Sequence, residues 1–371
     1  MAAHLLQPIR SRRKVEAAKE AVRALAIQLG ANNKLPTVRE MCKAMKISAV
    51  TAESVLDGLE AQQVVIRRPG SGIYVSPRLY QKNIGLVFGR HAFQAGSSPF
   101  CAILVESSRR RAKTNNENFS FFLDVAPVDE TGEKPGPADL VDALSKSRLD
   151  GMLLVARHSV NQETWLRDQG VPVVTFDIVK PNARHSVGFD LFDLIKTSTQ
   201  SLVDRGCRRL AMISSYGRAK TIFPEVAQSL GIEFREDWYL NPVESAPAGS
   251  SRTEVAHNAA RQFIQTCGAN QHNGRPDGLI VTDDMLTTGV VPALQEAGLK
   301  VGQDILVASH ANKGSLTLQA FESQLILVEV DPDQIVDTMF NMLEGMMTGT
   351  SKDPAAIAVP LSVRVGHSVS R

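Results

Sequence analysis

The sequence is poor in cysteine and contains no long apolar run. Its four cysteines have neither the spacing of a metal site nor the pairing of a disulfide framework, so we expect reduced structural thiols and no bound metal. No apolar segment approaches the ~18–20 residues of a membrane-spanning helix, and no signal peptide is evident. These absences predict a cytoplasmic protein that does not enter a membrane.

The motifs of common enzymes are also absent. The sequence has no Gly-x-Ser-x-Gly nucleophile elbow, no phosphate-binding GxxxxGK[ST] loop and no HExxH zinc motif. Asp283 and Asp284 are adjacent, so on a strand their carboxylates would point to opposite faces and could not work as an acid–base couple. We therefore predict that the chain is not an enzyme and needs no cofactor.

The charge of the chain is unevenly distributed. Its 371 residues, 43% hydrophobic, suffice for two or three globular domains, and the net charge is only +2. Residues 1–79 hold 13 of the 41 basic and 6 of the 39 acidic side chains, a formal +7, whereas the remainder holds 28 and 33, a formal −5. We therefore expect contact with a polyanion to be confined to the N-terminal part.

Three helices are predicted in this basic part. A first helix over Lys14–Leu29 precedes a short helix that Thr37 and Glu40 can open with a capping box, and Ser48 can cap another after a tight turn. The expected inward side chains are Val15, Ala18, Val22, Leu25 and Leu29 of the first helix, then Val38, Met41, Cys42 and Met45, and finally Ala52, Val55, Leu56 and Leu59.

A glycine-rich hairpin follows, with strands at 64–66 and 73–75 and a turn at Arg67–Gly72. Short helices and a hairpin in this order are what a winged helix-turn-helix needs to place one helix in a DNA groove. The Gly70-Ser71-Gly72 sequence is no dinucleotide fingerprint, because a third glycine and a following helix are missing. The alternative is a small helical domain whose basic residues are merely solvated, but the order of these features favours DNA binding.

The segment resembles the DNA-binding domain of the GntR family of bacterial repressors over roughly residues 10–76. LPTVRE at 35–40, RRPGSGIYV at 67–75 and the pattern of the second short helix carry the match. The resemblance implies that Arg39, Ser48, Thr51 and Gly72 face DNA. With the outer face of that helix and the hairpin turn, the candidate DNA-binding residues are Arg39, Ser48, Ala49, Val50, Thr51, Glu53, Ser54, Arg67, Arg68, Gly70 and Gly72.

Two positions depart from the family pattern. Ala49 and Glu53 stand where the family usually has arginine, and each lost phosphate contact should lower the salt dependence of binding by about one unit of slope. Glu53 can still accept a hydrogen bond from a cytosine amino group, and Val50 can touch a thymine methyl. Basic residues at 10–14 can supply further phosphate contacts. The sequence therefore predicts an unusual operator, with a head that has lost DNA binding as the alternative.

The remainder alternates apolar runs of strand length with stretches of helical spacing, such as Phe100–Asn115, Leu191–Arg205 and Thr287–Gly298. Continuous apolar strands between helices predict an α/β domain with parallel sheets. The predicted strands are Ile84–Phe88, Phe119–Val125, Gly151–Val155, Val171–Phe176, Leu210–Ser214, Leu279–Thr282 and Ile305–Ala308.

This part resembles the effector-binding domain of LacI/GalR-type repressors, which has the type I periplasmic-binding-protein fold, over residues 83–366. The phrases NIGLVFGR, LDGMLLVAR, GVPVVTFD, RGCRRLAMIS, PDGLIVTDDMLTTGVVPALQEAGL and VGQDILVASH occur in the family's order. The resemblance implies two parallel-sheet subdomains, joined by three crossovers, that hold a small molecule, often a sugar, between the carboxyl ends of their strands.

Mapped onto this sequence, the ligand-binding candidates are Phe100, Asp177, Asp190, Arg218, Asp284 and Asn312. Strand-end carboxylates can accept hydrogen bonds from sugar hydroxyls. Asp190 could instead cap the helix that follows, and Lys220 is an alternative to Arg218. The family's frequent aspartate after the seventh strand is Ala311 here, and an often aromatic position is His310.

Taken together, the chain resembles arabinose-repressor-type regulators. We expect residues 1–76 to form an α+β winged helix-turn-helix domain, 77–83 a linker, and 84–371 an α/β effector-binding and dimerisation domain. The predicted function is that of a repressor, a homodimer on a pseudo-palindromic double-stranded DNA operator in the nucleoid, controlled by a small-molecule effector of carbohydrate type. The alternatives are a sugar-binding module with a vestigial head and an enzyme on a flavodoxin-like sheet.

Overall fold

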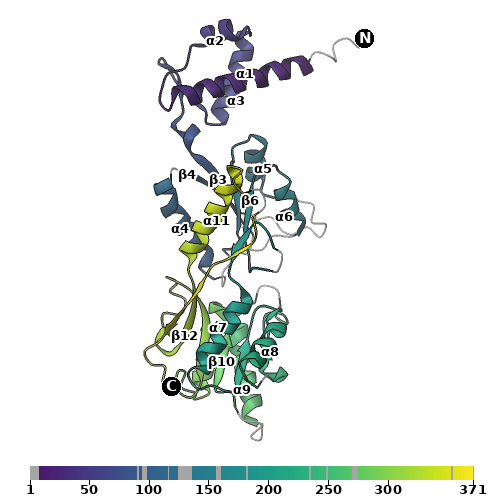
Figure 1. The fold of residues 1–371 in the computed structure, drawn as a ribbon, viewed down its shortest axis with the longest axis vertical. Coiled ribbons are helices and arrows are strands. Elements are labelled where there is room, and N and C mark those ends of the chain that lie inside the picture. The colour runs from purple at the N-terminus through teal and green to yellow at the C-terminus, as the bar shows by residue number, and fades with distance from the viewer. Residues whose placement is uncertain are drawn as a thin grey trace, which may run out of the picture.

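The computed structural model describes residues 8–89, 92–93, 98–115, 117–123, 136–155, 160–180, 183–233, 235–247, 250–269, 275–351 and 354–370. The basic side chains predicted at 10–13 lie outside what is described. Three bodies follow one another along the longest axis of the molecule (Figure 1). The head comprises residues 8–80. The N-subdomain comprises 82–188 and 332–358, and the C-subdomain comprises 190–330 and 361–370.

The head has the predicted order of helices and hairpin. Its elements are α1 (Pro8–Leu29), α2 (Val38–Met45), α3 (Ala49–Ala61), β1 (Val65–Arg68) and β2 (Gly72–Val75), with β1 and β2 antiparallel. Thr37 and Glu40 form the predicted capping box at the start of α2, and Ser48 caps α3 by accepting from the Thr51 amide. All four predicted inward side chains of α3 are buried. The local signals at the helix starts therefore place both short helices correctly.

The predicted inward face of α1 is wrong at its last turn. Leu29 is 36% exposed, whereas Ala26, which was not predicted to be buried, is fully buried. Ala18, Val22 and Ala26 follow one another at a spacing of four residues, which keeps them on one side of the helix and leaves Leu29 beside it. Only Met41 is buried in the predicted stripe of α2, because this helix lies at the edge of the small head core.

The predicted linker is structured. Pro77–Tyr80 forms a 3₁₀ helix that Ser76 caps, and the Tyr80 hydroxyl donates to the carbonyl oxygens of Ala26 (3.3 Å) and Ile27 (2.9 Å) at the end of α1. Strand β3 begins at Lys82, so the last two residues of the predicted linker lie in the first sheet. Gln81 alone separates the head from the N-subdomain.

The N-subdomain is a six-stranded parallel sheet of order β13-β7-β6-β5-β3-β4. Its strands are β3 (Lys82–Phe88), β4 (Glu117–Leu123), β5 (Gly151–Val155), β6 (Val173–Phe176), β7 (Ser186–Gly188) and β13 (Ile357–Ala358). Its helices are α4 (Phe100–Asn115), α5 (Ala138–Ser145), α6 (Val160–Arg167) and α11 (Pro332–Met347). The strand β5 is buried along its whole length, as expected for a strand covered by helices on both faces.

The C-subdomain is a six-stranded sheet of order β14-β12-β11-β10-β8-β9. Its strands are β8 (Leu210–Ile213), β9 (Tyr239–Leu240), β10 (Gly278–Val281), β11 (Leu306–Asn312), β12 (Ile326–Val330) and β14 (Leu361–Val365). Its helices are α7 (Leu191–Val203), α8 (Ala219–Ser229), α9 (Arg252–Ala269) and α10 (Asp284–Glu296). The edge strand β14 is antiparallel to β12, a departure from the predicted all-parallel sheet.

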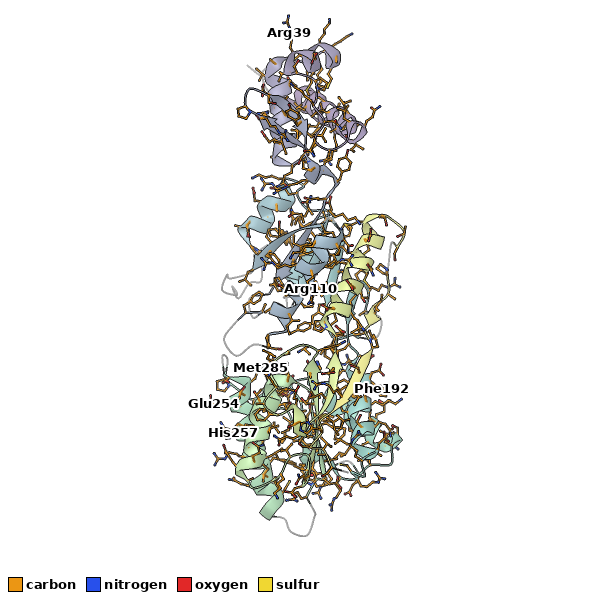
Figure 2. The ribbon with its side chains drawn as sticks, turned by 90° about the vertical axis from the view of Figure 1, so that its left-hand side faces the viewer. Arg39, Arg110, Phe192, Glu254, His257 and Met285 are labelled. Carbon is orange, nitrogen blue, oxygen red and sulfur yellow. The ribbon has the colours of Figure 1, made fainter. Side chains whose placement is uncertain are left out.

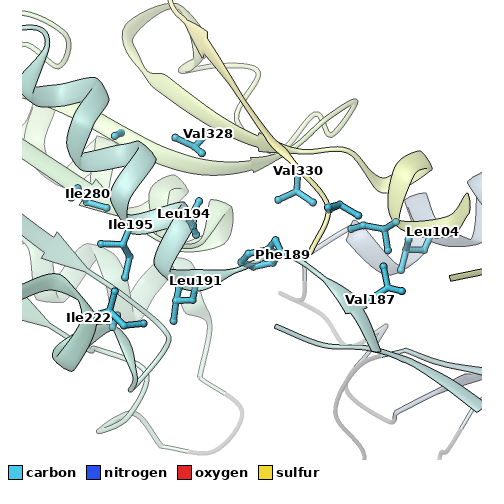
Figure 3. Packing of buried hydrophobic residues seen from close by; sticks show 14 of the residues in the cluster. Leu104, Val187, Phe189, Leu191, Leu194, Ile195, Ile222, Ile280, Val328 and Val330 are labelled. Carbon is cyan, nitrogen blue, oxygen red and sulfur yellow. The ribbon is translucent and has the colours of Figure 1, made fainter. Parts of the chain in front are cut away.

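The chain crosses between the two subdomains at three places, after β7, after β12 and after β13. Phe189 lies in the first crossover, is 5% exposed, and belongs to an apolar cluster with members in both subdomains (Figure 3). The three crossovers and the two-domain α/β architecture confirm the predicted fold class. Within the described ranges no helix combines the length and apolar character needed to cross a bilayer.

Candidate DNA-binding surface and ligand site

The tip of the head carries an exposed cation. Arg39 lies in the first turn of α2, and Figure 2 places it at the end of the molecule farthest from the C-subdomain. It forms no ion pair with any residue that the structure describes. The charge of Arg39 is therefore free to meet a phosphate or a guanine edge.

The outer face of α3 carries both polar and apolar side chains. Val50 is 81% exposed, and Ala49, Glu53 and Ser54 are also exposed. The hydroxyl of Ser48 accepts from the Thr51 amide at 3.2 Å and lies 2.9 Å from the Thr51 hydroxyl. These two predicted contacts are thus engaged in starting the helix, and α3 presents Val50, Glu53 and Ser54 outward.

We call the β1–β2 hairpin the wing. Its two arginines, Arg67 and Arg68, point to opposite faces of the hairpin, as adjacent residues of a strand must. Arg68 is exposed, and its guanidinium carbon lies 4.4 Å from the centroid of the Tyr74 ring. Arg67 turns toward α3 and forms ion pairs with Asp57 (2.8 Å) and Glu53 (3.2 Å). Arg67 and Glu53, both candidates for DNA contact, therefore contact each other.

The turn of the wing depends on glycine. Gly70 and Gly72 have φ angles of +69° and +119°, a left-handed region that side chains rarely adopt. A Cβ atom on Gly72 would also lie 2.7 Å from the Lys34 side chain. Glycine at these positions lets the hairpin turn sharply, and the Lys34 ammonium and the Arg68 guanidinium lie 5.9 Å and 4.4 Å from the centroid of the Tyr74 ring.

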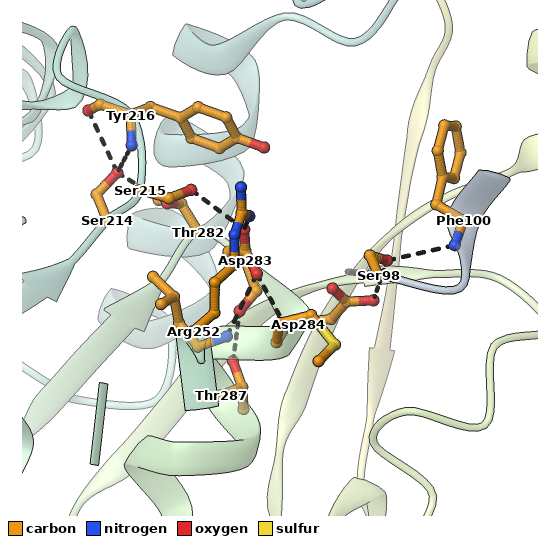
Figure 4. A network of polar contacts seen from close by, with 12 residues as sticks. Ser98, Phe100, Ser214, Ser215, Tyr216, Arg252, Thr282, Asp283, Asp284 and Thr287 are labelled. Atoms are coloured by element: carbon orange, nitrogen blue, oxygen red, sulfur yellow. Dashed lines mark hydrogen bonds and ion pairs between the residues drawn. The ribbon is translucent and has the colours of Figure 1, made fainter. Parts of the chain in front are cut away.

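In the second domain the structure brings two predicted ligand candidates together. Asp284 is the first residue of α10 and is 2% exposed, and it accepts a hydrogen bond of 3.0 Å from the Asn312 amide at the end of β11. Its Oδ2 also accepts from the Ser98 hydroxyl at 3.4 Å (Figure 4). Ser98 precedes α4 in the N-subdomain, so this hydrogen bond joins the two subdomains.

Asp283 has a structural role that the sequence analysis did not predict. It caps α10 by accepting from the amides of Met285 and Leu286, and it forms an ion pair with Arg252 of α9 (Figure 4). The Ser215 hydroxyl donates to the same carboxylate at 3.2 Å. The position of an aspartate directly after the predicted strand Leu279–Thr282, a few residues before the predicted helix, was the signal that could have revealed the cap.

Of the other ligand candidates, Phe100 is linked to this pair, because its backbone amide donates to the Ser98 hydroxyl oxygen at 3.4 Å, and the rest contact other residues. Asp190 caps α7 by accepting from the Phe192 amide at 2.7 Å, as the alternative interpretation expected. Asp177 accepts from the Lys180 ammonium at 2.7 Å, and its side chain is 45% exposed. The Phe100 ring packs on Phe176, with ring centroids 4.7 Å apart. Arg218 is exposed at the start of α8, and its alternative Lys220 forms an ion pair with Glu236.

His310 is buried beside this site. It is 6% exposed, stacks on Phe189 with ring centroids 5.3 Å apart, and neither ring nitrogen has a hydrogen-bond partner among the described residues. Burial lowers the pKa of His310, against the opposing attraction of Asp284. Ala311 faces the other side of β11 and packs in the apolar cluster beneath α10. The aromatic position of the family is therefore filled by an uncharged ring at the first crossover.

Replacing Asp284 by Asn should raise the melting temperature. Burial, reinforced by the Asp283 carboxylate, raises the pKa of Asp284, so the folded chain favours its uncharged form. An acid whose pKa is higher in the folded state destabilises the fold above that pKa, and the cost is absent below the ordinary value of 3.8. Calorimetry should therefore find a larger gain at neutral pH than below that value. Equal gains would contradict this account of Asp284.

Two families match parts of the chain. Residues 14–75 match the family described as bacterial regulatory proteins, gntR family, and residues 199–369 match a periplasmic-binding-protein-like domain. The first match covers the winged head. The second covers most of the C-subdomain together with α11 and the last strands.

Curated relatives have low identity to the chain. The HTH-type transcriptional regulator GntR of Escherichia coli strain K12 is 24% identical over 232 residues, which are 62% of this chain and 66% of that protein. The HTH-type transcriptional repressor PurR of Yersinia pestis bv. Antiqua is 23% identical over 226 residues, 58% of this chain and 62% of that protein. The chain thus spans less than two thirds of these relatives, both of which are named as transcription regulators and not as enzymes.

Solved structures share the fold. The transcription regulator CcpA of Lactococcus lactis has a TM-score of 0.60 at 17% identity, covering 78% of this chain and all of that chain. The regulator CelR in complex with cellobiose has a TM-score of 0.62 at 18% identity, covering 87% and 92%. The lac repressor dimer bound to operator and the anti-inducer ONPF has a TM-score of 0.59 at 16% identity, covering 78% and 94%. The chain therefore joins a gntR-family helix-turn-helix domain to a periplasmic-binding-protein-like domain in one polypeptide.

Proposed function

We propose that this chain is a transcription regulator that binds operator DNA with its head and whose operator affinity is controlled by a small molecule held between the two subdomains. The observation that carries the proposal is the union of a gntR-family reading head with a two-subdomain domain whose halves meet at Ser98 and Asp284. A ligand that changes this contact would shift the balance between two arrangements of the subdomains.

The ligand is a sugar or sugar derivative, and the regulator is a repressor. Asp284 and Asn312 offer buried oxygen and amide groups that suit hydroxyl groups of a sugar. The CelR structure was solved with cellobiose, and PurR and the lac repressor are named as repressors. We infer a homodimer on a pseudo-palindromic operator, because two heads related by a two-fold axis match two half-sites. The place of action is then the cytoplasmic nucleoid.

A hydrogen bond connects the N-subdomain directly to α3, the helix that we propose enters the DNA groove. The Arg148 guanidinium, between α5 and β5, donates from Nε to the carbonyl oxygen of Ala61, the last residue of α3, at 3.2 Å. Asp150, two residues later, accepts from the Asn83 amide at 2.7 Å at the start of β3. A rotation of the N-subdomain would therefore move the end of α3 through Arg148 as well as through the chain itself.

Replacing Arg148 by Ala should uncouple the two domains. Effectors typically change the affinity at a coupled site about 5- to 150-fold, and we expect less than about threefold in this variant because one of the two connections to α3 is lost. Fluorescence anisotropy with labelled operator, with and without effector, measures the factor. Effector affinity should not change, and Arg209→Ala in the C-subdomain is the matched control. A full response in Arg148→Ala would contradict this route.

Selection of bound fragments from random DNA tests the proposal itself. A recovered palindrome supports the reader, defines the spacing of the half-sites and supplies the probe for an effector screen. Operator affinity should fall in the presence of the inducing sugar. Recovery of no fragment by the folded protein at low and moderate salt would count against the proposal.

One observation favours a second candidate function, a sugar-binding module whose head no longer reads DNA. Glu53, Asp57 and Glu60 place three carboxylates on the helix that would enter the groove. The two functions differ in a simple measurement, because the second predicts sugar binding by calorimetry together with no enrichment in the DNA selection.

A further inference from the structure

Three carboxylates form a stripe along the reading helix. Glu53, Asp57 and Glu60 occupy positions i, i+4 and i+7 of α3, so they lie on one side of the helix, which faces β1. Their side chains are 52%, 67% and 41% exposed. We call them the acidic stripe. Left uncompensated, such charges would repel phosphates whenever α3 approached a DNA groove.

Arg67 contacts every member of the acidic stripe. Its Nη1 lies 2.8 Å from Asp57 Oδ1, its Nη2 lies 3.2 Å from Glu53 Oε2, and its Nε lies 3.7 Å from Glu60 Oε2. The Arg67 amide also donates to Glu60 Oε1 at 3.1 Å, and its Nη2 donates to the Glu53 carbonyl oxygen at 3.4 Å. The side chain is 33% exposed. One guanidinium thus joins two turns of α3 to the first strand of the wing.

A fork of five N–H donors suits arginine for such a junction, whereas a lysine ammonium would act as a single point charge. Single exposed ion pairs contribute little to stability, but several carboxylates that share one ordered guanidinium form a network. The neighbouring Arg68 points away from the stripe and stacks on Tyr74, so it stays available to solvent and to DNA. Of the two arginines of the wing, Arg67 therefore contacts α3 and Arg68 faces solvent.

We propose that Arg67 is a positioning residue of the reading head and not a phosphate contact. It neutralises part of the acidic stripe and fixes the wing against α3, so that the helix can approach DNA with its stripe compensated. This inference rests on the proposed DNA-binding function, and it assigns the phosphate contacts to other cations of the head, Arg39 and Arg68 among them.

The test uses charge-neutral replacements in the full-length chain. Arg67→Met should weaken binding to a selected operator fragment by about tenfold or more, the range of one lost charged contact. Adding Glu53→Gln and Asp57→Asn should restore affinity to within about threefold of the parent, since only Glu60 of the stripe then stays charged and most of the repulsion that Arg67 offsets is removed. Arg235→Met, which removes a partly buried arginine paired with Asp237 in the C-subdomain, is the matched control.

A phosphate contact gives a different pattern. In that case Arg67→Met would cost the same factor with and without the two carboxylates, and the slope of log affinity against log salt would fall by about one unit in both backgrounds. That outcome would overturn the proposal while leaving the DNA-binding function intact.

A second measurement needs no DNA, so it tests the positioning role of Arg67 even if the parent protein binds no DNA. Hydrogen exchange of the α3 amides reports the local stability of the head. Asp57→Asn should speed exchange in the parent, where it removes an ion pair. It should slow exchange in Arg67→Met, where it removes a repulsion between carboxylates. Additive effects of the two substitutions would show that Arg67 does not hold the stripe.

Discussion

Replacing Arg39 by Ala weakens operator binding about 5- to 150-fold and leaves effector affinity unchanged; this is the result we expect, since a charged contact to DNA contributes roughly 1–3 kcal/mol. Arg39 is exposed in the first turn of α2 at the tip of the head, and it forms no ion pair within the described part of the chain. Unlike Arg67, it has no carboxylate to neutralise. Its whole charge is available to the polyanion.

Anisotropy titrations at several salt concentrations measure this effect. If Arg39 meets a phosphate, the salt slope should fall by about one unit, and if it reads a guanine edge, the loss should be largest on the preferred sequence. Arg23→Ala is the matched control, because Arg23 lies on α1 of the same head, where it donates to Gln62 at 2.9 Å. Unchanged affinity of Arg39→Ala would exclude the docking of α2 against DNA.

Replacing Gly188 by Ala should produce the largest loss of stability. A Cβ atom on Gly188 would lie 1.7 Å from the carbonyl oxygen of Asp177, a backbone atom that cannot rotate away. Overpacking of this kind costs about 3 kcal/mol or more, which corresponds to a fall of roughly 6–12 °C in the melting temperature of a domain of this size. Differential scanning calorimetry measures it.

Gly217 offers the matched control for Gly188. A Cβ atom there would meet no atom within 4 Å, so Gly217→Ala should leave the melting temperature nearly unchanged. Because Gly188 directly precedes the first crossover, its alanine variant should also alter effector affinity where the fold survives. A Gly188→Ala protein as stable as the parent would mean that the Asp177 segment can move aside without cost.

The sequence was most informative where the structure is local. The capping box of Thr37 and Glu40, the cap at Ser48 and the buried stripe of α3 each depend on residues a few positions apart, and all are present. The buried strands β3, β5, β8 and β10 were likewise predictable from their continuous apolar runs, whereas the equally buried β12 was not among the predicted strands. By contrast, β7 and β9 have three and two residues, too few for any periodicity, and most of β14 is exposed at a sheet edge.

The candidate sites divide in the same way. Asp284 and Asn312 were expected at the same sheet edge, because parallel strands end on one side. Ser98 was not predicted as a partner, since 186 residues separate it from Asp284 and only the packing of two subdomains joins them. The engagement of Arg67 by Asp57 was equally hidden, because a strand and a helix must first pack before their charges meet. The predicted hairpin turn made Arg67 a candidate for DNA contact but could not reveal this contact with α3.

The short junction after the head has a consequence for exchanging parts between such proteins. Tyr80 is tied to the last turn of α1, and β3 begins two residues later at Lys82. A chimaera that grafts a foreign reader onto this sensor should therefore be joined at Gln81 and should carry its own equivalent of Pro77–Tyr80. A junction at residue 76 would separate the head from the 3₁₀ helix whose Tyr80 hydroxyl binds the end of α1.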